Sequence, residues 1–292
     1  MKLVTYSKNG QAPQVGLIGT DPEKIVPVSA LGFSAPDMPA FIDQLAGASP
    51  LSLLDRVDAA AGDARAACRL LAPIRRPRQD VVCLGVNYYE HRDETLASNI
   101  KYDGKLSNPV YFSKRVNQAV DPDGEIESHT GLTAALDYEV ELAVVLGRDA
   151  RDVPAEDVEQ YVLGYTVLND VSARDLQSAH QQWYFGKSLD GFTPIGPWIV
   201  TRDELPWMPK AGIRSYVNGE LRQNSSTELM MTKIDAAIHQ LSQGMTLLAG
   251  TIIAMGTPSG VGMAFDPPRY LKPGDVVRCE VDGVGVLENT VR

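Results

Sequence analysis

The sequence has few cysteines and no long apolar stretch. Among its 292 residues there are only three cysteines, and they are scattered through the chain: Cys68, Cys83 and Cys279. An odd number without paired spacing argues against a disulfide framework and against a zinc site built from cysteines, and is typical of a reducing compartment. No run of about eighteen or more apolar residues occurs, so we expect no membrane span. The first residues lack the apolar core of a signal peptide, and we predict a cytoplasmic location.

The sequence also lacks an excess of basic residues. Lysine and arginine number 27 against 37 aspartates and glutamates, which gives a formal net charge of −10. A nucleic-acid-binding protein needs a basic stripe, and the densest basic run here, IRRPR at 74–78, is typical of a solvated linker. An acidic protein still binds an anionic small molecule where a few cations and a metal ion reverse the local field. We therefore expect a small-molecule partner, and neither nucleic acid nor membrane.

Turn signals and short apolar runs predict an α+β protein in two parts. Residues 1–75 are expected to form a small N-terminal α+β domain, in which short strands are followed by a helix over roughly 51–71. Residues 76–292 are expected to form the catalytic domain and contain more strands, separated by turns such as DPDG and KPGD. Helices are expected there near 155–160, 173–184 and 227–249. Because strands and helices do not alternate regularly, this second part is predicted to be a mixed, β-rich domain.

The stretch LDYEVELAVVLG, residues 136–147, places three carboxylates on one face of a strand. They are Asp137, Glu139 and Glu141. Unpaired buried carboxylates are costly, so they must be protonated or meet cations, and a divalent ion satisfies a same-face pair such as the two glutamates. Ligands that are all oxygen favour Mg²⁺, followed by Mn²⁺ or Ca²⁺. A solvent-facing edge strand would explain the same charges, and from these residues alone both interpretations remain open.

A second polar group follows the expected strand YVLGYTVLND. Asp170 lies at the strand end, where it could reach a metal ion held by a neighbouring strand, and Ser172 is expected to cap the next helix. Arg174 and Gln177 are three residues apart and share a helix face, so their donor groups match a carboxylate or keto oxygen. The alternative for this segment alone is a capping aspartate beside an ordinary surface arginine.

A candidate general base lies in GVNYYEHRDE, residues 85–94. His91 and Glu94 are spaced i, i+3, so in a helical turn the carboxylate orients the imidazole, although this spacing also occurs by accident on surfaces. Lys187 lies in a glycine-flanked turn that presents donors to anions. MGTPSGVG, residues 255–262, is a glycine-rich loop without the lysine of a P-loop, which argues against nucleotide binding. For this loop alone, a tight turn is the better explanation.

Together these segments resemble the fumarylacetoacetate hydrolase (FAH) family. Five segments match motifs of the family, in its order, over most of 80–290: GVNYYEH with the following Glu94, DYEVELAVVLG, NDVSARDLQ, GKSLDGFTPIGPW and GTPSGVG. The resemblance implies an FAH-type β-roll fold, a homodimer, and a site for Mg²⁺ or Mn²⁺ that Ca²⁺ could also occupy. The small-molecule substrate that it implies is an anionic 2-oxo acid.

The resemblance also implies roles for individual residues. The metal ligands would be Glu139, Glu141 and Asp170. The catalytic groups would be His91, Glu94 and Lys187. The substrate-binding groups would be Arg174, Gln177, Lys187 and Thr257. Asp137 lies outside the family's pair of glutamates and is expected to be structural, and water is expected where some relatives use a further aspartate.

The predicted activity is hydrolysis of a C–C bond in an acylpyruvate or diketo acid through a metal-bound enolate. In this hypothesis the catalytic dyad, His91 with Glu94, activates a water that attacks the distal carbonyl of the substrate. The resulting oxyanion is stabilised by Lys187, Gln177 and Arg174. The same enolate serves decarboxylation or tautomerisation of oxaloacetate and hydration or isomerisation of 2-oxo-alkenoates, so these alternatives stay open. A catalytically silent binding protein is a further alternative. Residues 95–105 are expected to form a mobile lid.

Overall fold

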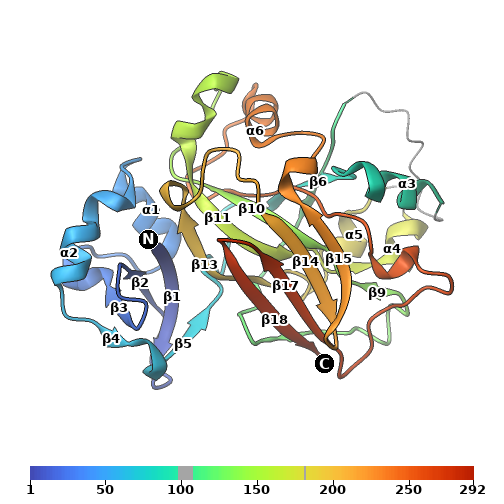
Figure 1. Cartoon of the computed structure of the whole chain (residues 1–292), viewed down its shortest axis with the longest axis horizontal. Helices are drawn as coiled ribbons and strands as arrows, with labels where there is room; N and C mark the ends of the chain where they lie inside the picture. The colour runs from blue at the N-terminus through green and yellow to red at the C-terminus, as the bar shows by residue number, and fades with distance from the viewer. Residues whose placement is uncertain (98–107, 181) are drawn as a thin grey trace.

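The computed structural model describes residues 1–97, 108–180 and 182–292. Among them, eleven strands form one large sheet, in the order β4-β3-β2-β1-β13-β11-β10-β16-β6-β7 with β5 beside β1 (Figure 1). Their bounds are Lys2–Lys8 (β1), Gln14–Ile18 (β2), Lys24–Pro27 (β3), Asp63–Ala64 (β4), Cys68–Leu71 (β5), Val81–Gly85 (β6), Val110–Lys114 (β7), Val140–Leu146 (β10), Val162–Asn169 (β11), Ile195–Thr201 (β13) and Ile252–Ala254 (β16).

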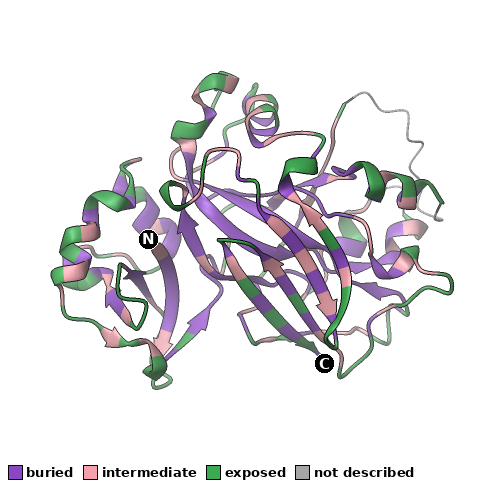
Figure 2. Ribbon diagram, viewed as in Figure 1, coloured by how far each residue is buried: buried purple, intermediate pink, exposed green. Residues whose placement is uncertain are grey.

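A second sheet packs against β10 and β11. Its order is β15-β14-β17-β18-β8, with bounds Glu125–Ile126 (β8), Gly212–Val217 (β14), Glu220–Ser226 (β15), Val276–Val281 (β17) and Gly285–Val291 (β18). The two sheets share one apolar core, in which Val140 and Leu142 lie with Ile213, Val277 and Leu287. Figure 2 shows the resulting buried band where the sheets face each other. The prediction of a mixed, β-rich α+β fold is confirmed.

The N-terminal strands continue the large sheet without a break. β1 pairs antiparallel with β13, with Lys2 opposite Val200 and Leu3 opposite Ile199. Leu3 also belongs to an apolar core that extends to Ile195 and, on helix α1 (Met38–Leu45), to Phe41. One sheet and one core therefore cross the expected boundary, and the division into 1–75 and 76–292 remains a prediction.

The expected helix over 51–71 is wrong. The chain instead forms a 3-10 turn, Pro50–Leu53, and the short helix α2, Leu54–Ala59, before it enters β4 and β5. β5 pairs with β1 along its length. Gly62 packs closely on Ile25, whose carbonyl oxygen lies 2.6 Å from the position that a Cβ would take. Pairing with distant strands therefore overrides the helical propensity of this alanine- and leucine-rich segment.

The helices of the second part are shorter than expected. Residues 155–160 lie in a 3-10 helix, the segment 173–184 divides into α4 and α5, and 227–249 holds only α6 and a 3-10 turn. The bounds are Tyr89–Ala97 (α3), Arg174–Ala179 (α4), Tyr184–Lys187 (α5) and Ile234–Ser242 (α6). Ser172 does not cap α4, because it lies in the short strand β12 (Ser172–Ala173) and its Oγ donates to Asp170 O. No helix in the described ranges is long and apolar enough to cross a membrane.

Strand β10, which carries most of the acidic segment, lies in the interior of the large sheet. It pairs with β11 on one side and with β16 on the other, and all seven of its residues are buried. The backbone leaves strand geometry at Tyr138 and Glu139, between β9 (Leu136–Asp137) and β10. The pairing of Val140 with Asn169 brings the start of β10 beside the end of β11. The edge-strand interpretation is therefore wrong.

Helix α3 ends at the limit of the described residues. The lid expected over 95–105 begins within its last turn, Thr95–Ala97, where Thr95 Oγ1 donates to His91 O at 2.9 Å. The rest of that segment, 98–105, lies outside the described residues. The lid stays a prediction.

Candidate active site

Three carboxylates converge where β10 begins and β11 ends. One oxygen each from Glu139, Glu141 and Asp170 lies within 4.8 Å of the other two, and all three side chains are buried. The strand register explains this, since Glu139 and Glu141 flank Val140 and Asp170 directly follows Asn169. Hard oxygen donors at this spacing suit a divalent cation. The role of the three as metal ligands remains a prediction that the geometry fits.

Backbone groups hold the three carboxylates in place. Glu139 N donates to Asn169 Oδ1 at 3.0 Å, and Asp170 N donates to Glu139 O at 2.8 Å. Gly256 N donates to Glu141 Oε2 at 2.7 Å, with Gly256 at a φ of 87°, in the left-handed region that favours glycine. The glycine-rich loop is therefore more than a tight turn, because it orients a carboxylate of the cluster.

Two buried lysines face the cluster from different elements. Lys187, at the end of α5, places Nζ 2.8 Å from Glu139 Oε2 and 2.7 Å from Asp170 Oδ2. Lys114, at the end of β7, places Nζ 2.5 Å from Asp170 Oδ1 and donates to Val171 O at 3.0 Å. Both oxygens of Asp170 therefore have an ammonium partner. The sequence motifs do not point to Lys114, whose only signal is a lysine that closes the apolar segment PVYFSK.

The carboxylates of the cluster differ in their protonation. Burial raises the pKa of Glu139, but the charges of Lys187 and Arg174 outweigh it and hold this pKa below its ordinary range. Burial, with the charges of Asp170 and Glu139, raises the pKa of Glu141 well above its ordinary value. Glu141 is therefore the carboxyl that keeps a proton when no cation is present. A divalent ion would take the place of that proton, so the donor set fits Mg²⁺ or Mn²⁺.

Asp137 is directed away from the cluster and anchors Arg174. Its oxygens accept from Gly262 N at 2.7 Å and from Arg174 Nε at 2.8 Å. Arg174 NH1 lies 2.6 Å from Glu139 Oε1 and donates to Gln177 Oε1 at 3.1 Å. Because Arg174 is buried, its interpretation as an ordinary surface arginine is wrong. Its NH2 has no hydrogen-bond partner among the described residues, which leaves one donor for a ligand.

His91 and Glu94 lie one turn apart on α3. His91 Nδ1 is 3.3 Å from Glu94 Oε2, and Glu94 Oε1 accepts from Gly260 N at 2.7 Å. His91 is buried at a cavity wall, so the pair is not an accident of the surface. On the same helix, Glu90 Oε2 accepts from Ser259 Oγ at 2.8 Å. Two carboxylates of α3 therefore dock the helix on the glycine-rich loop.

The turn before α3 has a strained backbone, which hydrogen bonds to distant segments of the chain hold in place. Val86 has a φ of 56°, which is rare for a β-branched residue. The side chain of Asn87 donates to Met255 O at 2.8 Å and to Thr232 O at 3.0 Å, and accepts from Thr232 N at 2.7 Å. Strained residues persist only where such contacts determine them. Asn87 therefore positions the cavity wall at Val86, a role that the sequence motifs did not assign.

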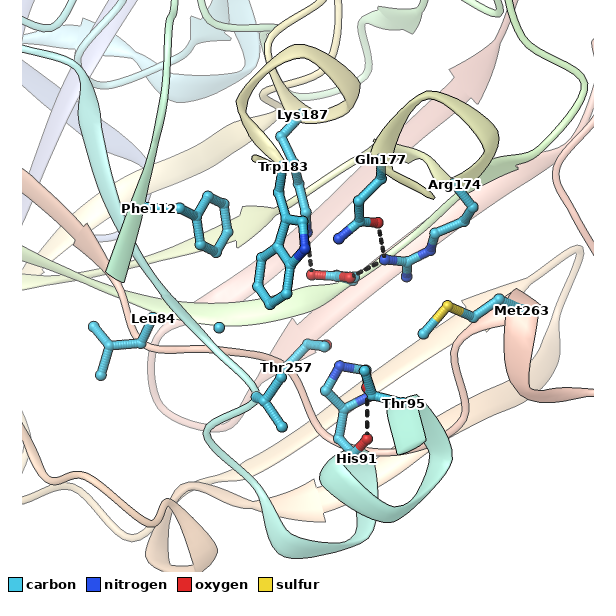
Figure 3. A pocket seen from close by; sticks show the side chains of 13 residues that line it. Leu84, His91, Thr95, Phe112, Arg174, Gln177, Trp183, Lys187, Thr257 and Met263 are labelled. Carbon is cyan, nitrogen blue, oxygen red and sulfur yellow. Dashed lines mark hydrogen bonds and ion pairs between the residues drawn. The ribbon is translucent and has the colours of Figure 1, made fainter. Parts of the chain in front are cut away.

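These groups enclose a small cavity of about 20 Å³ (Figure 3). Its polar wall consists of His91, Thr95, Glu139, Arg174, Gln177, Lys187 and Thr257. In Figure 3 His91 approaches from the side opposite Lys187 and Gln177, with Phe112 and Trp183 along one flank. The Phe112 ring lies 5.1 Å from Lys187 Nζ. Because this volume is close to that of one water molecule, the cavity suits only a compact ligand head.

The hydroxyl of Thr257 is already engaged within the protein. Oγ1 donates to Val140 O at 2.9 Å and accepts from Gln223 Nε2 at 2.7 Å. Gln223 Oε1 in turn accepts from Val140 N at 3.0 Å and from Ser215 Oγ at 2.8 Å. This buried network joins the second sheet to the start of β10, and no motif in the sequence singles out Gln223. Substrate binding by Thr257 remains a prediction.

Residues 80–292 match the family model described as "Fumarylacetoacetate (FAA) hydrolase C-terminal". The matched region includes all the polar residues of the cavity and all three carboxylates of the cluster. The chain belongs to the fumarylacetoacetate hydrolase family, and the resemblance drawn from its motifs is confirmed.

Three similar proteins show how the family varies in reaction. Oxaloacetate tautomerase YisK of Bacillus subtilis is 41% identical over 223 residues, 76% of this chain and 73% of that protein. The mitochondrial oxaloacetate tautomerase fahd2 of Xenopus laevis is 38% identical over 299 residues, 100% of this chain and 90% of that protein. The crystal structure of maleylpyruvate hydrolase from Sphingobium sp. SYK-6, in complex with manganese(II) and pyruvate, matches with a TM-score of 0.76 at 27% identity. The match covers 100% of this chain and 98% of that chain. Membership therefore indicates an enzyme without fixing its reaction.

The substitution Lys114→Met leaves one buried oxygen of Asp170 without its ammonium partner. Because removal of one partner leaves a buried charge uncompensated, we expect the free energy of unfolding in metal-free buffer to fall by about 3–5 kcal/mol, measured by urea denaturation. Lys210→Met is the matched control. Lys210 pairs with Glu228 at the exposed surface, so its loss should lower that free energy by less than about 1 kcal/mol. Equal losses in the two variants would contradict the buried pairing.

Binding of Mg²⁺ or Mn²⁺ should release a proton from Glu141. Its raised pKa keeps the carboxyl protonated, and the ion requires the carboxylate, so affinity should increase as the pH rises toward that pKa. Titration calorimetry with Mn²⁺ in two buffers of different ionisation enthalpy measures the protons released. Glu141→Gln should abolish the release, whereas Glu228→Gln at the surface should preserve it. Identical heats in both buffers would refute the protonated carboxyl.

Proposed function

We propose that this chain is a divalent-metal-dependent enzyme that interconverts the keto and enol forms of oxaloacetate. The observation that carries the proposal is the buried cluster of Glu139, Glu141 and Asp170. Through Glu139 this cluster reaches the wall of a cavity that is also lined by Arg174, Lys187 and His91. The sequence motifs put hydrolysis first and tautomerisation second. Two similar proteins are oxaloacetate tautomerases, and one of them aligns with the whole chain, which supports placing tautomerisation before hydrolysis.

The groups of the small cavity are suited to hold a 2-oxo acid. Mg²⁺ or Mn²⁺ would be held by Glu139, Glu141 and Asp170, and when bound it supplies the Lewis acidity that stabilises an enolate oxygen. The unpaired NH2 of Arg174 donates to a carboxylate oxygen of the substrate. Lys187 Nζ, at the cavity wall, donates to the oxygen on carbon 2, where negative charge develops.

The proton on carbon 3 moves through His91 in this proposal. Because Nδ1 faces Glu94, Nε2 is the nitrogen available for the substrate. In the keto-to-enol direction, Nε2 takes the proton from carbon 3 while the oxygen on carbon 2 gains one from Lys187. Return of the His91 proton to Lys187 through solvent completes the cycle. Glu94, fixed by Gly260 N, keeps the imidazole oriented during the transfer.

Hydrolysis of an acylpyruvate or another diketo acid is the second candidate. The same dyad is suited to activate a water, and the similar maleylpyruvate hydrolase structure holds pyruvate with manganese(II). In this reaction His91 takes a proton from water, the hydroxide adds to the distal carbonyl, and the C–C bond breaks with its electron pair leaving as an enolate. Isomerisation of a 2-oxo-alkenoate stays an alternative, because the similar solved structures include the 2-hydroxyhepta-2,4-diene-1,7-dioate isomerase of Mycobacterium marinum. Decarboxylation of oxaloacetate, hydration of 2-oxo-alkenoates and a silent binding role have no further observation in their favour.

The proposal extends to the cofactor, the assembly and the location. Mg²⁺ and Mn²⁺ suit the carboxylate set equally, and manganese(II) in the similar hydrolase supports this class of ion. A homodimer follows from the family resemblance, and Leu229 and Met231 are apolar side chains exposed in the single chain. A cytoplasmic location follows from the scattered cysteines, and the similar proteins include one from a bacterium and one from mitochondria.

Oxaloacetate itself provides the direct test of the proposed function. With Mg²⁺ present, the protein should accelerate the conversion of the enol to the keto form, followed by the ultraviolet absorbance of the enol, and EDTA should abolish the acceleration. Coupling to lactate dehydrogenase detects pyruvate and therefore decarboxylation. Loss of acetylpyruvate absorbance detects hydrolysis. Formation of pyruvate from either substrate without exchange of the tautomers would overturn the proposal.

Two substitutions should separate metal binding from turnover. Glu139→Ala should lose Mn²⁺ binding in calorimetry together with activity, because it removes a carboxylate of the cluster. His91→Ala should bind Mn²⁺ normally but turn over about 10²–10⁴-fold more slowly, the usual contribution of a general base. His180→Ala is the control, because His180 is exposed, does not line the small cavity, and contacts Leu176 O and the ring of Phe185. Full turnover in His91→Ala would remove the dyad from the reaction.

A further inference from the structure

A second and larger cavity, of about 770 Å³, adjoins the small one. Arg174 and Met263 border both cavities, and Figure 3 shows them on the same side of the smaller one. A ligand whose head fills the small cavity therefore extends past these two side chains into the larger one. The wall of the larger cavity is where any group beyond the head would be recognised.

That wall carries negative charge. Three carboxylates line the larger cavity: Glu94, Asp175 and Asp266. Burial raises the pKa of Asp175, but hydrogen bonds from Thr133 Oγ1 at 2.5 Å and Ala134 N at 2.9 Å outweigh it and keep this pKa below its ordinary value. Asp175 is thus ionised near neutral pH, and Asp266 is exposed to solvent. A distal group in this cavity faces carboxylates on several sides.

Positive charge is confined to the junction of the two cavities. Among the described residues that line the larger cavity, Arg174 is the only cationic one. Its Nε and NH1 already face Asp137 and Glu139, so NH2 is the one donor left. The remaining wall is largely apolar or uncharged, as at Ala97, Ala135, Phe265 and Pro268. An anionic group therefore finds a cationic donor at the junction, and the other described residues of the wall offer no second cation.

We propose that the larger cavity is the subsite for the distal part of the substrate, and that its carboxylates exclude a negative charge beyond carbon 4 of the 2-oxo acid. This proposal takes one point from the proposed function, namely that the 2-oxo acid head binds at the cluster of Glu139, Glu141 and Asp170. A carboxylate on carbon 3, as in oxaloacetate, lies at the junction, where the second hydrogen of Arg174 NH2 donates to it while the first serves the carboxylate of the head. A longer dicarboxylic acid places its second carboxylate opposite Glu94, Asp175 and Asp266, whereas a neutral acyl or alkyl tail is accepted.

Two six-carbon ligands with the same head test this subsite. 2-Oxohexanoate ends in a methyl group and 2-oxoadipate in a carboxylate, and both are titrated by calorimetry into the protein with Mn²⁺. We expect 2-oxohexanoate to bind about tenfold more tightly at low salt, because like charges repel across a partly solvated wall. The ratio should shrink in about 0.5 M sodium chloride, which screens charges beyond a few ångströms.

Charge reversal at the wall gives the matched variants. Asp266→Lys should reduce the ratio of the two affinities at least threefold, since it turns a repulsive charge into an attractive one. Asp55→Lys makes the same change at an exposed site of α2 in the N-terminal part and should leave the ratio unchanged. Equal affinities for the two acids, or a ratio that neither Asp266→Lys nor salt alters, would overturn the proposal.

Pyruvate separates failure of this inference from failure of the proposed function. Pyruvate has the 2-oxo acid head and no tail. If pyruvate binds with Mn²⁺ while both six-carbon acids fail to bind, the larger cavity is not a tail subsite. If pyruvate does not bind and oxaloacetate is not converted, the proposed function fails, and the tail subsite falls with it.

Discussion

Neutralisation of charge in a dry interior is the constraint on which this structure depends. Unpaired charges there are costly, and this chain buries four carboxyl groups, two lysines and one arginine together: Asp137, Glu139, Glu141, Asp170, Lys114, Lys187 and Arg174. The three cations come from β7, α4 and α5, and the carboxylates from the β9–β10 segment and the end of β11. Pairing of these charges therefore fixes how the short helices dock on the large sheet, and it forms the cavity at the same time.

The two lysines of the cluster are not equivalent. Lys114 is fully buried beside Asp170 and does not line the small cavity, so a ligand in that cavity cannot replace Asp170 as its partner. Burial lowers the pKa of Lys187, but Asp170 and Glu139 outweigh it and raise this pKa above its ordinary value, so its ammonium persists at the cavity wall. Lys114 therefore balances the charge of Asp170 away from the cavity, and Lys187 is the lysine of the cluster that lines the cavity wall.

The glycine-rich loop connects the two halves of the site. Gly256 N fixes Glu141 in the carboxylate cluster, and Gly260 N fixes Glu94 beside His91. Hydrogen bonds from backbone amides cost little conformational freedom and hold a carboxylate at a set angle. A shift of this loop would therefore move the candidate metal ligands and the candidate base together. This linkage couples the position of the carboxylate cluster to that of the His91–Glu94 pair.

The sequence by itself determined the local relations: the i, i+3 pair of His91 and Glu94, the position of Asp170 at a strand end, and the family. These depend on short spacings, which secondary structure converts directly into neighbours. Only the tertiary structure decided that Lys114 faces Asp170, that residues 51–71 yield to strand pairing, and that carboxylates line the larger cavity. Such contacts join segments far apart in the chain, and they follow from packing and charge balance, which no local pattern records.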